Sequence, residues 1–478
     1  MRLSVALSPQ EEERSVTKRI AIYGNSFNPP ARHHRTIAQA ISLHPNIFFD
    51  ELIVRPCGPR PDKESTNDIE PTDRATMVDM TFAGIPRCRV DHSDLEASEF
   101  MRTIDLDESY RSRSDTEIWH VVTSNMLEGG QHGSSEIQQR WHRGRELWER
   151  ANFVVIGRGI YDAADFPPNA ILIPLDVPSS DLRIRERVFR GDDICDLVVP
   201  RVNDYIRRHR LYRGGLRRTP VPYRMDLSRP MVVIDRSYIN LPASRIRDQL
   251  GFSADPIEDP SCIIALGGDG HMMHTIRAYW PLRVPFFGIN AGHRGFHLNH
   301  LEADESPLDL ISGDLSLYRF PMLYVEYQDL EEHWHHAFAF QDAYTKENSG
   351  TIWIEMIEDG ITRYRRLVCD AALVSLPVGS TAYAKSMGAQ TMPVDVQALI
   401  FATIGFNDFS DPPTYRPRTL GLNTTFTFKN LEPGRRTSRA FIDGREMGDI
   451  LAMNIRVSRI ATAEVVFRKG HDPSAKLI

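Results

Sequence analysis

The first 210 residues alternate between short runs rich in β-branched residues and amphipathic helical stretches, and this alternation limits the fold more than any other feature. The expected strands are residues 19–24, 51–55, 117–123, 153–157 and 170–174, and the expected helices are residues 32–43, 72–83, 135–150, 179–189 and 197–209. Strands that alternate with helices pair in parallel, because each connection crosses the sheet with the same hand. The pattern predicts a Rossmann-like α/β domain over residues 18–212, with its active site at the carboxyl ends of the strands.

The rest of the chain changes character twice. A basic stretch with glycine and proline begins at residue 213, and we expect residues 213–228 to be a linker without periodicity. The strands expected after it are residues 231–235, 262–266 and 284–289, followed by long β-rich runs at 318–327, 336–344, 351–358, 362–376, 425–429 and 456–468. Residues 229–478 are therefore expected to form an α/β subdomain followed by a larger antiparallel β subdomain.

Composition argues against several classes of protein. A chain of 478 residues corresponds to two or three domains. Its net charge of −7 is unfavourable for binding nucleic acid or an anionic membrane. No signal peptide and no apolar run long enough to span a membrane is visible. The five cysteines form no Cys-x-x-Cys pair, which argues against a disulfide framework and a zinc site. We expect a cytoplasmic protein that binds neither nucleic acid nor membrane.

The first strand leads directly into a glycine turn and a helix. The turn is Gly24-Asn-Ser-Phe-Asn-Pro-Pro30, and the helix opens with Ala31-Arg-His-His-Arg35. A glycine turn lets backbone amides approach an anion, and the helix N-terminus adds its partial positive charge. These residues predict a phosphate site in which the histidines take part. The alternative is a tight turn with solvent-facing histidines.

This turn resembles the signature of the nicotinamide/nicotinate mononucleotide adenylyltransferases, in which Gly-Gly-Ser/Thr-Phe-Asp/Asn-Pro is followed by His-x-Gly-His. Further matches follow in chain order between residues 18 and 212: Pro61-Asp-Lys63, Arg74 with Met77, Trp141, Phe153-Val-Val-Ile-Gly-Arg-Gly159, Val177-Pro-Ser-Ser-Asp-Leu-Arg183 and the helical run 197–212. The resemblance implies a nucleotidyltransferase domain that joins nicotinamide mononucleotide (NMN) or nicotinate mononucleotide (NaMN) to the AMP part of ATP, with Mg²⁺ and release of pyrophosphate.

The same resemblance implies roles for single residues. His34 and Arg183 match the residues that neutralise the ATP phosphates and are the expected catalytic groups. The expected phosphate-binding residues are Gly24, Ser26, Phe27, His33, Ser179 and Ser180. Ser179 and Ser180 could equally cap the helix that follows them.

Four positions depart from the family pattern. Ala31 stands in place of the first histidine, His33 in place of glycine, Asn125 in place of aspartate and Asp62 in place of histidine. Two alternatives follow for the N-terminal half. Either it is an active adenylyltransferase, or it has lost catalysis and serves as a nucleotide-binding scaffold.

The strand expected at residues 262–266 ends in a second glycine turn, Gly267-Gly-Asp-Gly270, and we expect a helix to open at His271. The glycines let the backbone wrap closely around a polyphosphate. A carboxylate there would repel phosphate, unless Asp269 takes a proton from an acceptor hydroxyl or helps to hold Mg²⁺. A plain Asp-Gly turn is the alternative.

Further motifs make residues 229–478 resemble the NAD kinases: Gly288-Ile-Asn-Ala-Gly-His-Arg-Gly-Phe296, Leu376-Pro-Val-Gly-Ser-Thr-Ala-Tyr383 and Phe441-Ile-Asp-Gly-Arg445. The resemblance implies that Asp269 is the base that activates the 2′-hydroxyl of NAD. It implies that Gly267, Gly268 and Gly270 hold the ATP phosphates. The residues implied for the dinucleotide are Asn290, Gln341, Asp342, Asp370, Thr381, Ala382 and Tyr383.

Together the two halves predict a bifunctional enzyme that makes the pyridine dinucleotide and then phosphorylates it to NADP, with ATP and Mg²⁺ at both sites. We also expect a homo-oligomer, and the metal ligands remain unassigned. The alternatives are a monofunctional NAD kinase with an inactive N-terminal half, or a pair of enzymes that act on a modified dinucleotide. The acidic and histidine-rich run 331–336, and the pair His271 and His274, are weaker metal candidates.

Overall fold

The computed structural model describes residues 18–61, 63, 66, 68–112, 116–175, 177, 181–213, 220–235, 257, 259–290, 295, 297–302, 305–347, 350–405 and 416–470. The chain forms two compact units, and each has its own sheet and core. The first consists of Met1–Ile69 and Thr81–Tyr205, and the second of Glu70–Met80 and Ile206–Ile478. Among the described residues, no helix is long and apolar enough to cross a membrane.

The first unit is built on a six-stranded parallel sheet with the order β3-β2-β1-β4-β5-β6. Its strands are β1 (Lys18–Asn25), β2 (Glu51–Pro56), β3 (Cys88–Val90), β4 (Thr116–Thr123), β5 (Asn152–Gly157) and β6 (Ala170–Pro174). This is the strand order of a doubly wound Rossmann sheet. The predicted parallel α/β arrangement is confirmed, and the strand order reverses between β1 and β4.

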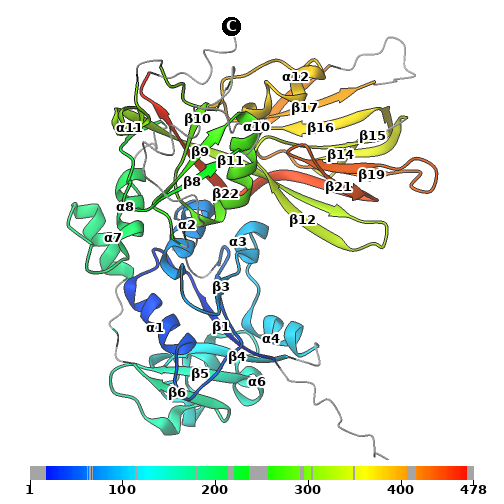
Figure 1. Ribbon diagram of the computed structural model, residues 1–478. Coiled ribbons are helices and arrows are strands. Elements are labelled where there is room, and N and C mark those ends of the chain that lie inside the picture. The colour runs from blue at the N-terminus through cyan, green and yellow to red at the C-terminus, as the bar shows by residue number, and fades with distance from the viewer. Residues whose placement is uncertain are drawn as a thin grey trace, which may run out of the picture. The chain divides into compact units, whose positions relative to one another are not determined.

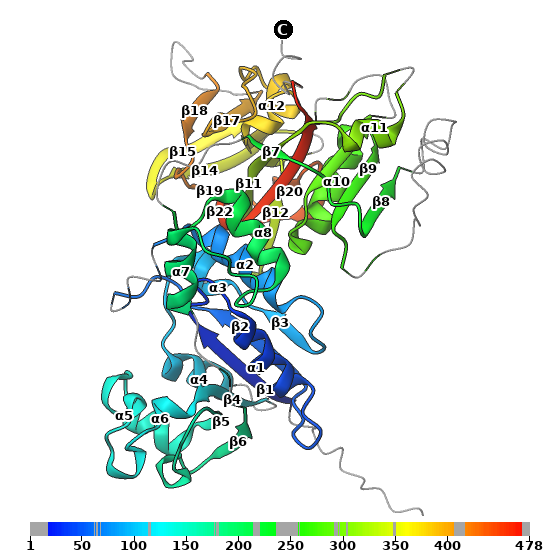
Figure 2. The same ribbon diagram turned by 90° about the vertical axis from the view of Figure 1, so that its left-hand side faces the viewer.

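Helices cover both faces of this sheet, with α1 on one side and α4 on the other (Figures 1 and 2). The helices up to residue 209 are α1 (Arg32–Ser42), α2 (Pro71–Phe82), α3 (Ser93–Ala97), α4 (Thr103–Arg111), α5 (Glu136–Arg140), α6 (Gly144–Arg150), α7 (Asp181–Arg190) and α8 (Pro200–His209). The single helix predicted for 135–150 is two helices. Arg143 adopts a φ of 52° between them, and a Cβ at Gly144 would lie 1.9 Å from the carbonyl oxygen of Ile137.

The second unit contains a ten-stranded sheet of mixed direction. Its strands are β7 (Val221–Tyr223), β8 (Pro230–Ile234), β9 (Cys262–Gly267), β10 (Phe286–Asn290), β11 (Leu315–Gln328), β12 (Trp334–Ala339), β14 (Ile352–Glu358), β15 (Ile361–Cys369), β19 (Phe426–Asn430) and β22 (Ala452–Arg468). The long strand β22 pairs in parallel with β10 and antiparallel with β11 and β19 (red in Figure 1). The predicted α/β and antiparallel parts therefore share one continuous sheet.

A second, six-stranded antiparallel sheet has the order β18-β17-β16-β13-β20-β21. Its strands are β13 (Asp342–Lys346), β16 (Ala371–Ser375), β17 (Ala398–Ile404), β18 (Arg418–Gly421), β20 (Arg439–Ile442) and β21 (Arg445–Asp449). The predicted runs 336–344 and 362–376 are each divided between the two sheets. The chain leaves the larger sheet at Ala339 and at Cys369, and it enters the smaller one at Asp342 and Ala371.

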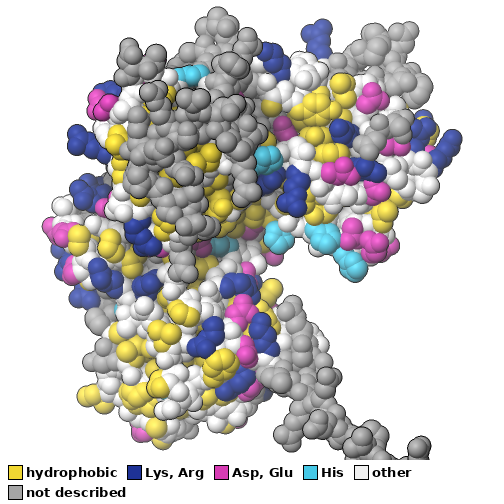
Figure 3. All heavy atoms as spheres, viewed as in Figure 1, with side chains coloured by type: hydrophobic (Ala, Val, Ile, Leu, Met, Phe, Trp, Pro, Cys, Tyr) yellow, Lys and Arg dark blue, Asp and Glu magenta, His cyan; other side chains and the backbone are white. Residues whose placement is uncertain are grey.

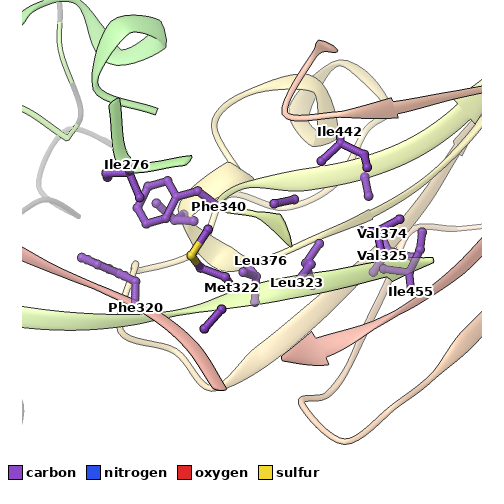
Figure 4. Packing of buried hydrophobic residues seen from close by; sticks show 14 of the residues in the cluster. Ile276, Phe320, Met322, Leu323, Val325, Phe340, Val374, Leu376, Ile442 and Ile455 are labelled. Carbon is purple, nitrogen blue, oxygen red and sulfur yellow. The ribbon is translucent and has the colours of Figure 1, made fainter. Parts of the chain in front are cut away.

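The main core of this unit collects side chains from both sheets and from α10 (Asp269–Tyr279). Figure 4 shows Phe340 beside Ile276 of this helix, with Leu376 and Ile442 in the same apolar cluster. All four side chains are almost fully buried. Burial removes their apolar surface from water, which is the main force that holds the two sheets together.

Two stretches group differently in the structure from the expected linker and domain limits, which stay predictions. Residues 221–223, which were expected in the linker, form β7 and pair antiparallel with β11. Residues 70–80, which were expected in the N-terminal domain, group with the second unit. The remaining helices of the second unit are short: α11 (Pro307–Ser312) and α12 (Tyr383–Ser386).

Candidate functional site

In the first unit, the predicted phosphate-binding turn lies at the carboxyl end of β1, next to β4. This is the point where the strand order reverses, and ligands of doubly wound sheets bind in the crevice that forms there. Gly24 and Asn25 end β1, and the buried Ser26 donates its backbone N–H to Asn25 Oδ1 at 2.7 Å. Ser124 follows β4 at the same edge. The topology therefore places Gly24 and Ser26 where a nucleotide would bind.

Phe27 has a structural role in this turn. Its side chain is 0% exposed and packs edge-to-face against Tyr23 and Phe82, with ring centroids 5.4 Å away in each case. The side chain is therefore part of the core, and only its backbone is available to a ligand. His33 is also buried, and its ring centroid lies 3.9 Å from that of His34.

His34 is buried at the start of α1, and its environment keeps it neutral. The backbone N–H of Ala31 donates to His34 Nδ1 at 3.0 Å. Burial, followed by the positive charges of Arg158 and Lys63, lowers the pKa of His34 to about 3. A neutral imidazole that accepts at Nδ1 carries its proton on Nε2. The Nε2 atom lies 3.4 Å from Asn25 Nδ2, so a phosphate oxygen that accepts its hydrogen bond would replace that contact. A neutral His34 differs from the positively charged group expected from the sequence, and its role at a phosphate stays a prediction.

Arg158 and Lys63 are the cations that sequence reasoning did not select. Arg158 follows β5, where its backbone N–H donates to Ser124 Oγ at 2.9 Å and its Nε donates to the Val177 carbonyl at 2.9 Å. Both cations lie close enough to His34 to lower its pKa. Lys63 is the cation of the motif Pro61-Asp-Lys63, and Arg158 is the cation of the run 153–159. These places in the matched motifs could have identified both residues from the sequence.

Arg183, the predicted catalytic arginine, is exposed on α7. Its neighbour Arg185 on the same helix pairs with Asp68 at 2.8 Å, and Asp68 also accepts a hydrogen bond from Asn28. This pairing ties the start of α7 to the turn after β1. Ser179 and Ser180 lie outside the described residues.

In the second unit, the strand β9 runs into the second glycine turn. Helix α10 begins at Asp269, two residues before the predicted start, with Gly268 as its N-cap. A Cβ at Gly267 would lie 2.9 Å from the His271 side chain, so glycine is required there. Asp269 Oδ1 accepts the backbone N–H of His297 at 2.8 Å. The Asp269 carboxylate is thereby held in the first turn of the helix, where backbone N–H groups favour an anion.

Asn290 lies beside this turn. It ends β10, and in the parallel pairing of β9 with β10 its register partner is Gly267. Its backbone N–H donates to the Asn299 carbonyl at 2.9 Å, and its Nδ2 lies 3.1 Å from His300 Nδ1. The structure thus brings Asn290 next to the predicted phosphate loop. Residues 291–294 and 296 of the same motif lie outside the described residues.

A second group of predicted residues meets where the chain passes between the two sheets. The carbonyl oxygen of Gln341 accepts the backbone N–H of Leu376 at 2.9 Å and Ser375 Oγ at 3.1 Å. These bonds fasten the Gln341-Asp342 corner to the loop that carries Thr381 and Ala382. Thr381 is half-buried and Ala382 is exposed.

Asp342, Asp370 and Tyr383 are electrostatically coupled. Burial and the nearby Asp443 carboxylate raise the pKa of Asp342 to about 7. Burial, then the negative charges of Asp370 and Asp342, raises the pKa of Tyr383. The Tyr383 ring centroid lies 4.8 Å from that of Tyr344. The structure therefore brings two predicted acids and the predicted tyrosine together at one corner.

The weaker metal candidates are not supported. Among the residues that the structure describes, no group of three or more His, Cys, Asp or Glu side chains could hold a metal ion. The histidines of the run 331–336 lie on the surface over β12 (Figure 3), where His335 Nε2 lies 2.6 Å from Asp329 Oδ2. Mg²⁺ in nucleotide sites is commonly held by one or two carboxylates together with substrate phosphates, and Asp269 at the phosphate turn fits that pattern.

Comparison with known proteins gives a consistent result over about half of the chain. The chain is 28% identical over 223 residues to an NAD kinase of Cereibacter sphaeroides, a match that covers 47% of this chain and 86% of that protein. It is 29% identical over 230 residues to an NAD kinase of Rickettsia bellii, covering 46% of this chain and 86% of the relative. An NAD kinase from another strain of Cereibacter sphaeroides is 26% identical over 257 residues, a match that covers 54% of this chain and 97% of that protein.

Two solved structures also match. A crystal structure of an NAD kinase from Archaeoglobus fulgidus in complex with ATP is 18% identical, covers 52% of this chain and 96% of that chain, and has a TM-score of 0.39. A crystal structure of yeast NADH kinase complexed with NADH is 14% identical, covers 76% of this chain and 87% of that chain, and also has a TM-score of 0.39. No family model matches the chain. In sequence, the chain is thus similar to bacterial NAD kinases over about half of its length.

Proposed function

We propose that the second unit transfers the γ-phosphate of ATP to the 2′-hydroxyl of NAD. The observation that carries this proposal is Asp269, a carboxylate held by His297 in the first turn of α10 and beside Asn290. A carboxylate in a phosphate-binding turn is explained when it acts on the nucleophile. The similarity to bacterial NAD kinases supports the same substrate pair.

In the proposed reaction, Asp269 takes the proton of the attacking hydroxyl as the new oxygen–phosphorus bond forms and ADP leaves. The amides of Gly267, Gly268 and Gly270 bind the ATP phosphates together with the N-terminus of α10. Bound Mg²⁺ would neutralise charge on those phosphates. Gln341, Asp342, Asp370 and Tyr383 would hold the dinucleotide, since three of them are coupled at one corner.

For the first unit we propose the adenylylation of NMN or NaMN. A phosphate oxygen of the mononucleotide attacks the α-phosphorus of ATP, and pyrophosphate leaves. The Rossmann strand order and the position of His34 at its reversal point support this reaction. Lys63, Arg158 and Arg183 would supply positive charge around the phosphorus, and His34 Nε2–H would donate a hydrogen bond.

The two proposed reactions form a sequence, because the dinucleotide made by the first is the substrate of the second. One alternative is a kinase whose first unit has lost catalysis, and Ala31 and Asn125 are the residues that favour it. Another is that both units process a modified dinucleotide. A cytoplasmic location and a homo-oligomeric state remain predictions.

The experiment that separates these proposals uses the full chain with ATP and Mg²⁺. One reaction receives NMN, a second NaMN and a third NAD, and the products are resolved by mass spectrometry. NADP from NAD supports the kinase, and its absence rejects it. Dinucleotide formed from either mononucleotide supports the adenylyltransferase, whereas its absence in a preparation that phosphorylates NAD leaves the first unit as a scaffold.

A further inference from the structure

An Asp-Gly turn with a buried aspartate and an exposed glycine joins β20 to β21 in the second unit. Asp443 and Gly444 adopt φ angles of 48° and 74°, and Asp-Gly is a preferred pair for a two-residue hairpin turn with both φ positive. The turn alone does not account for the burial of its aspartate, because such turns normally face water. The Asp443 residue is 2% exposed. A buried carboxylate of this kind requires partners.

Those partners are the backbone amides of the segment that leads into β13. Asp443 Oδ2 accepts the N–H of Phe340 at 2.8 Å, and Oδ1 accepts the N–H of Gln341 at 2.8 Å and that of Asp342 at 3.3 Å. In return, the Asp443 N–H donates to the Asp342 carbonyl at 2.9 Å. The chain passes between the two sheets at these residues. The carboxylate thus satisfies amides that would otherwise need another buried acceptor.

The turn also contacts the helix that carries Asp269. Arg277 of α10 donates from Nη1 to the Ile442 carbonyl at 3.2 Å. Phe340, Leu376 and Ile442, which flank the joined segments, are each 1% exposed in the main core. Asp443 is therefore fixed on one side by a packed core, and on the other it holds the Gln341-Asp342 corner.

We propose that Asp443 is a positioning residue that orients Gln341 and Asp342 toward the dinucleotide. At this place beside Asp443, the Asp342 carboxyl in its protonated form donates a hydrogen bond to an acceptor oxygen of the dinucleotide. The inference rests on the proposed kinase function, for which it deepens the description of the dinucleotide site.

The electrostatics agree with this assignment of the proton. Burial raises the pKa of the Asp443 carboxyl, while the backbone N–H bonds from Phe340, Gln341 and Asp342 and the positive charge of Arg277 oppose that rise. Burial, followed by the negative charge of Asp443, raises the pKa of Asp342 to about 7. Two interacting carboxyls do not both ionise readily, and we assign the proton to Asp342 because Asp443 is the carboxyl that accepts the backbone N–H bonds. The other titratable groups that face Asp342 are Tyr344 of β13 and Tyr383 of α12, with Asp370 beside Tyr383.

The chain offers a matched control turn. Asp359 and Gly360 join β14 to β15 with φ angles of 49° and 76°. Asp359 Oδ1 accepts the backbone N–H of Thr425 at 2.7 Å, and the Asp359 N–H donates to the Thr425 carbonyl at 3.0 Å. This turn repeats the backbone geometry of the Asp443 turn at an exposed position, and its bonds are to Thr425 and not to Gln341 or Asp342. Asp359→Asn therefore reports the loss of a turn carboxylate alone.

The test measures NAD binding by calorimetry and NAD phosphorylation by steady-state kinetics in Asp443→Asn and Asp359→Asn, each between pH 5.5 and 8.5. For Asp443→Asn we expect KM and Kd for NAD to rise by about tenfold at neutral pH, while KM for ATP changes by less than about threefold. The pH above which NAD binding weakens should also move down by about one unit, because Asp342 ionises more easily without the second charge. Asp359→Asn should leave KM and Kd for NAD, and the pH at which NAD binding weakens, unchanged. An Asp443→Asn protein with unchanged KM, Kd and pH profile would overturn the proposal.

A second variant covers the case in which Asp443→Asn does not fold. Asp342→Asn carries a neutral hydrogen-bond donor at every pH, so NAD binding should lose the pH dependence that the unchanged protein shows near neutrality. A flat profile in the unchanged protein, or the same profile in both, would reject the role of the Asp342 proton. NAD binding and NAD phosphorylation are measured separately, so the two proposals can be told apart. A chain that binds NAD without phosphorylating it contradicts the proposed function, but its NAD binding still tests the role of Asp443. A chain that neither binds nor phosphorylates NAD contradicts both proposals.

Discussion

Asp269 is the single residue on which the kinase proposal depends most. Asp269→Asn retains the shape of the side chain, and its amide oxygen can still accept the N–H of His297. We expect NADP formation from NAD to fall by about 10²–10⁴-fold, because the general base is lost while the phosphate turn remains. Formation of dinucleotide from the mononucleotide should continue, so that NAD accumulates. Both activities are measured on one preparation, with thermal melting as the control. Unchanged phosphorylation would remove Asp269 from the mechanism.

The sequence motif and the surroundings of His34 suggest different chemical roles for this residue. Its motif position suggested positive charge, but burial together with two nearby cations keeps the ring neutral. We expect His34→Ala to reduce adenylyl transfer by about tenfold or more, since a donor to the transition state is lost. His34→Gln, which retains an N–H donor, should preserve more activity than His34→Ala. Equal losses in the two variants would contradict the donor role.

The raised pKa of Asp342 leads us to expect that the folding stability of the protein depends on pH. Its pKa is raised to about 7 in the folded protein, so the folded state binds more protons than the unfolded state between the ordinary pKa of 3.8 and about 7. Stability from this group is complete below the lower value and is lost as pH rises through the upper one, with a slope of at most about 1.4 kcal/mol per pH unit. Asp342→Asn should flatten melting temperature against pH in this window. The same slope of melting temperature against pH in the unchanged protein and in Asp342→Asn would contradict this prediction.

At the scale of elements, the sequence predicts the positions of strands better than their partners. The predicted runs 336–344 and 362–376 are correct as extended structure, but each contains a change of sheet that hydrophobic pattern does not mark. The change depends on which distant strand offers a partner, which is a tertiary effect. Gln341 and Asp370 lie at these two changes, so two of the residues that we propose for the dinucleotide occupy the places that local pattern describes least well.

The turn formed by Pro377–Gly379 gives a prediction at this scale. A Cβ at Gly379 would lie 2.5 Å from Ser375 Oγ and 3.0 Å from the Gln341 carbonyl oxygen. We expect Gly379→Ala to break the bond between these two groups, to destabilise the protein by about 1–3 kcal/mol and to raise KM for NAD. Gly421→Ala is the matched control, because no atom lies within 4 Å of its added Cβ. Denaturant unfolding and steady-state kinetics check both, and equal behaviour would show that the turn does not support the corner.

At the scale of the whole molecule, the sequence predicts two halves but not their limits. The motifs separate cleanly near residue 212, whereas the second compact unit also takes in residues 70–80 and 206–212. These additions are held by ion pairs between residues that are far apart in the chain. Arg319 pairs with Asp73 and Arg283 with Asp79, both at 2.8 Å. No local pattern reports such pairs, because each charge is unremarkable in its own segment.

A fragment limited to residues 229–478 should therefore fold poorly. It retains Arg283, Arg319 and Glu464 but lacks Asp79, Asp73 and the two partners of Glu464, Arg208 and His209. Glu464 is largely buried, and burial would raise its pKa, but the charge of Arg208 and the hydrogen bond to His209 lower it to about 2. Removing one partner of a buried ion pair costs about 3–5 kcal/mol, so several such losses approach the stability of a whole domain.

Soluble yield and thermal melting of four chains test this expectation: the full chain, two fragments and one variant of the shorter fragment. The fragment 229–478 should be insoluble or melt far below the full chain, and the fragment 206–478, which restores Arg208 and His209, should recover part of the difference. Glu464→Gln in the shorter fragment should also recover part of it, because a neutral amide costs less to bury without a cationic partner than a carboxylate does. A fragment 229–478 that melts at the temperature of the full chain would show that residues 70–80 and 206–212 are dispensable, and that the predicted domain limit is the correct one.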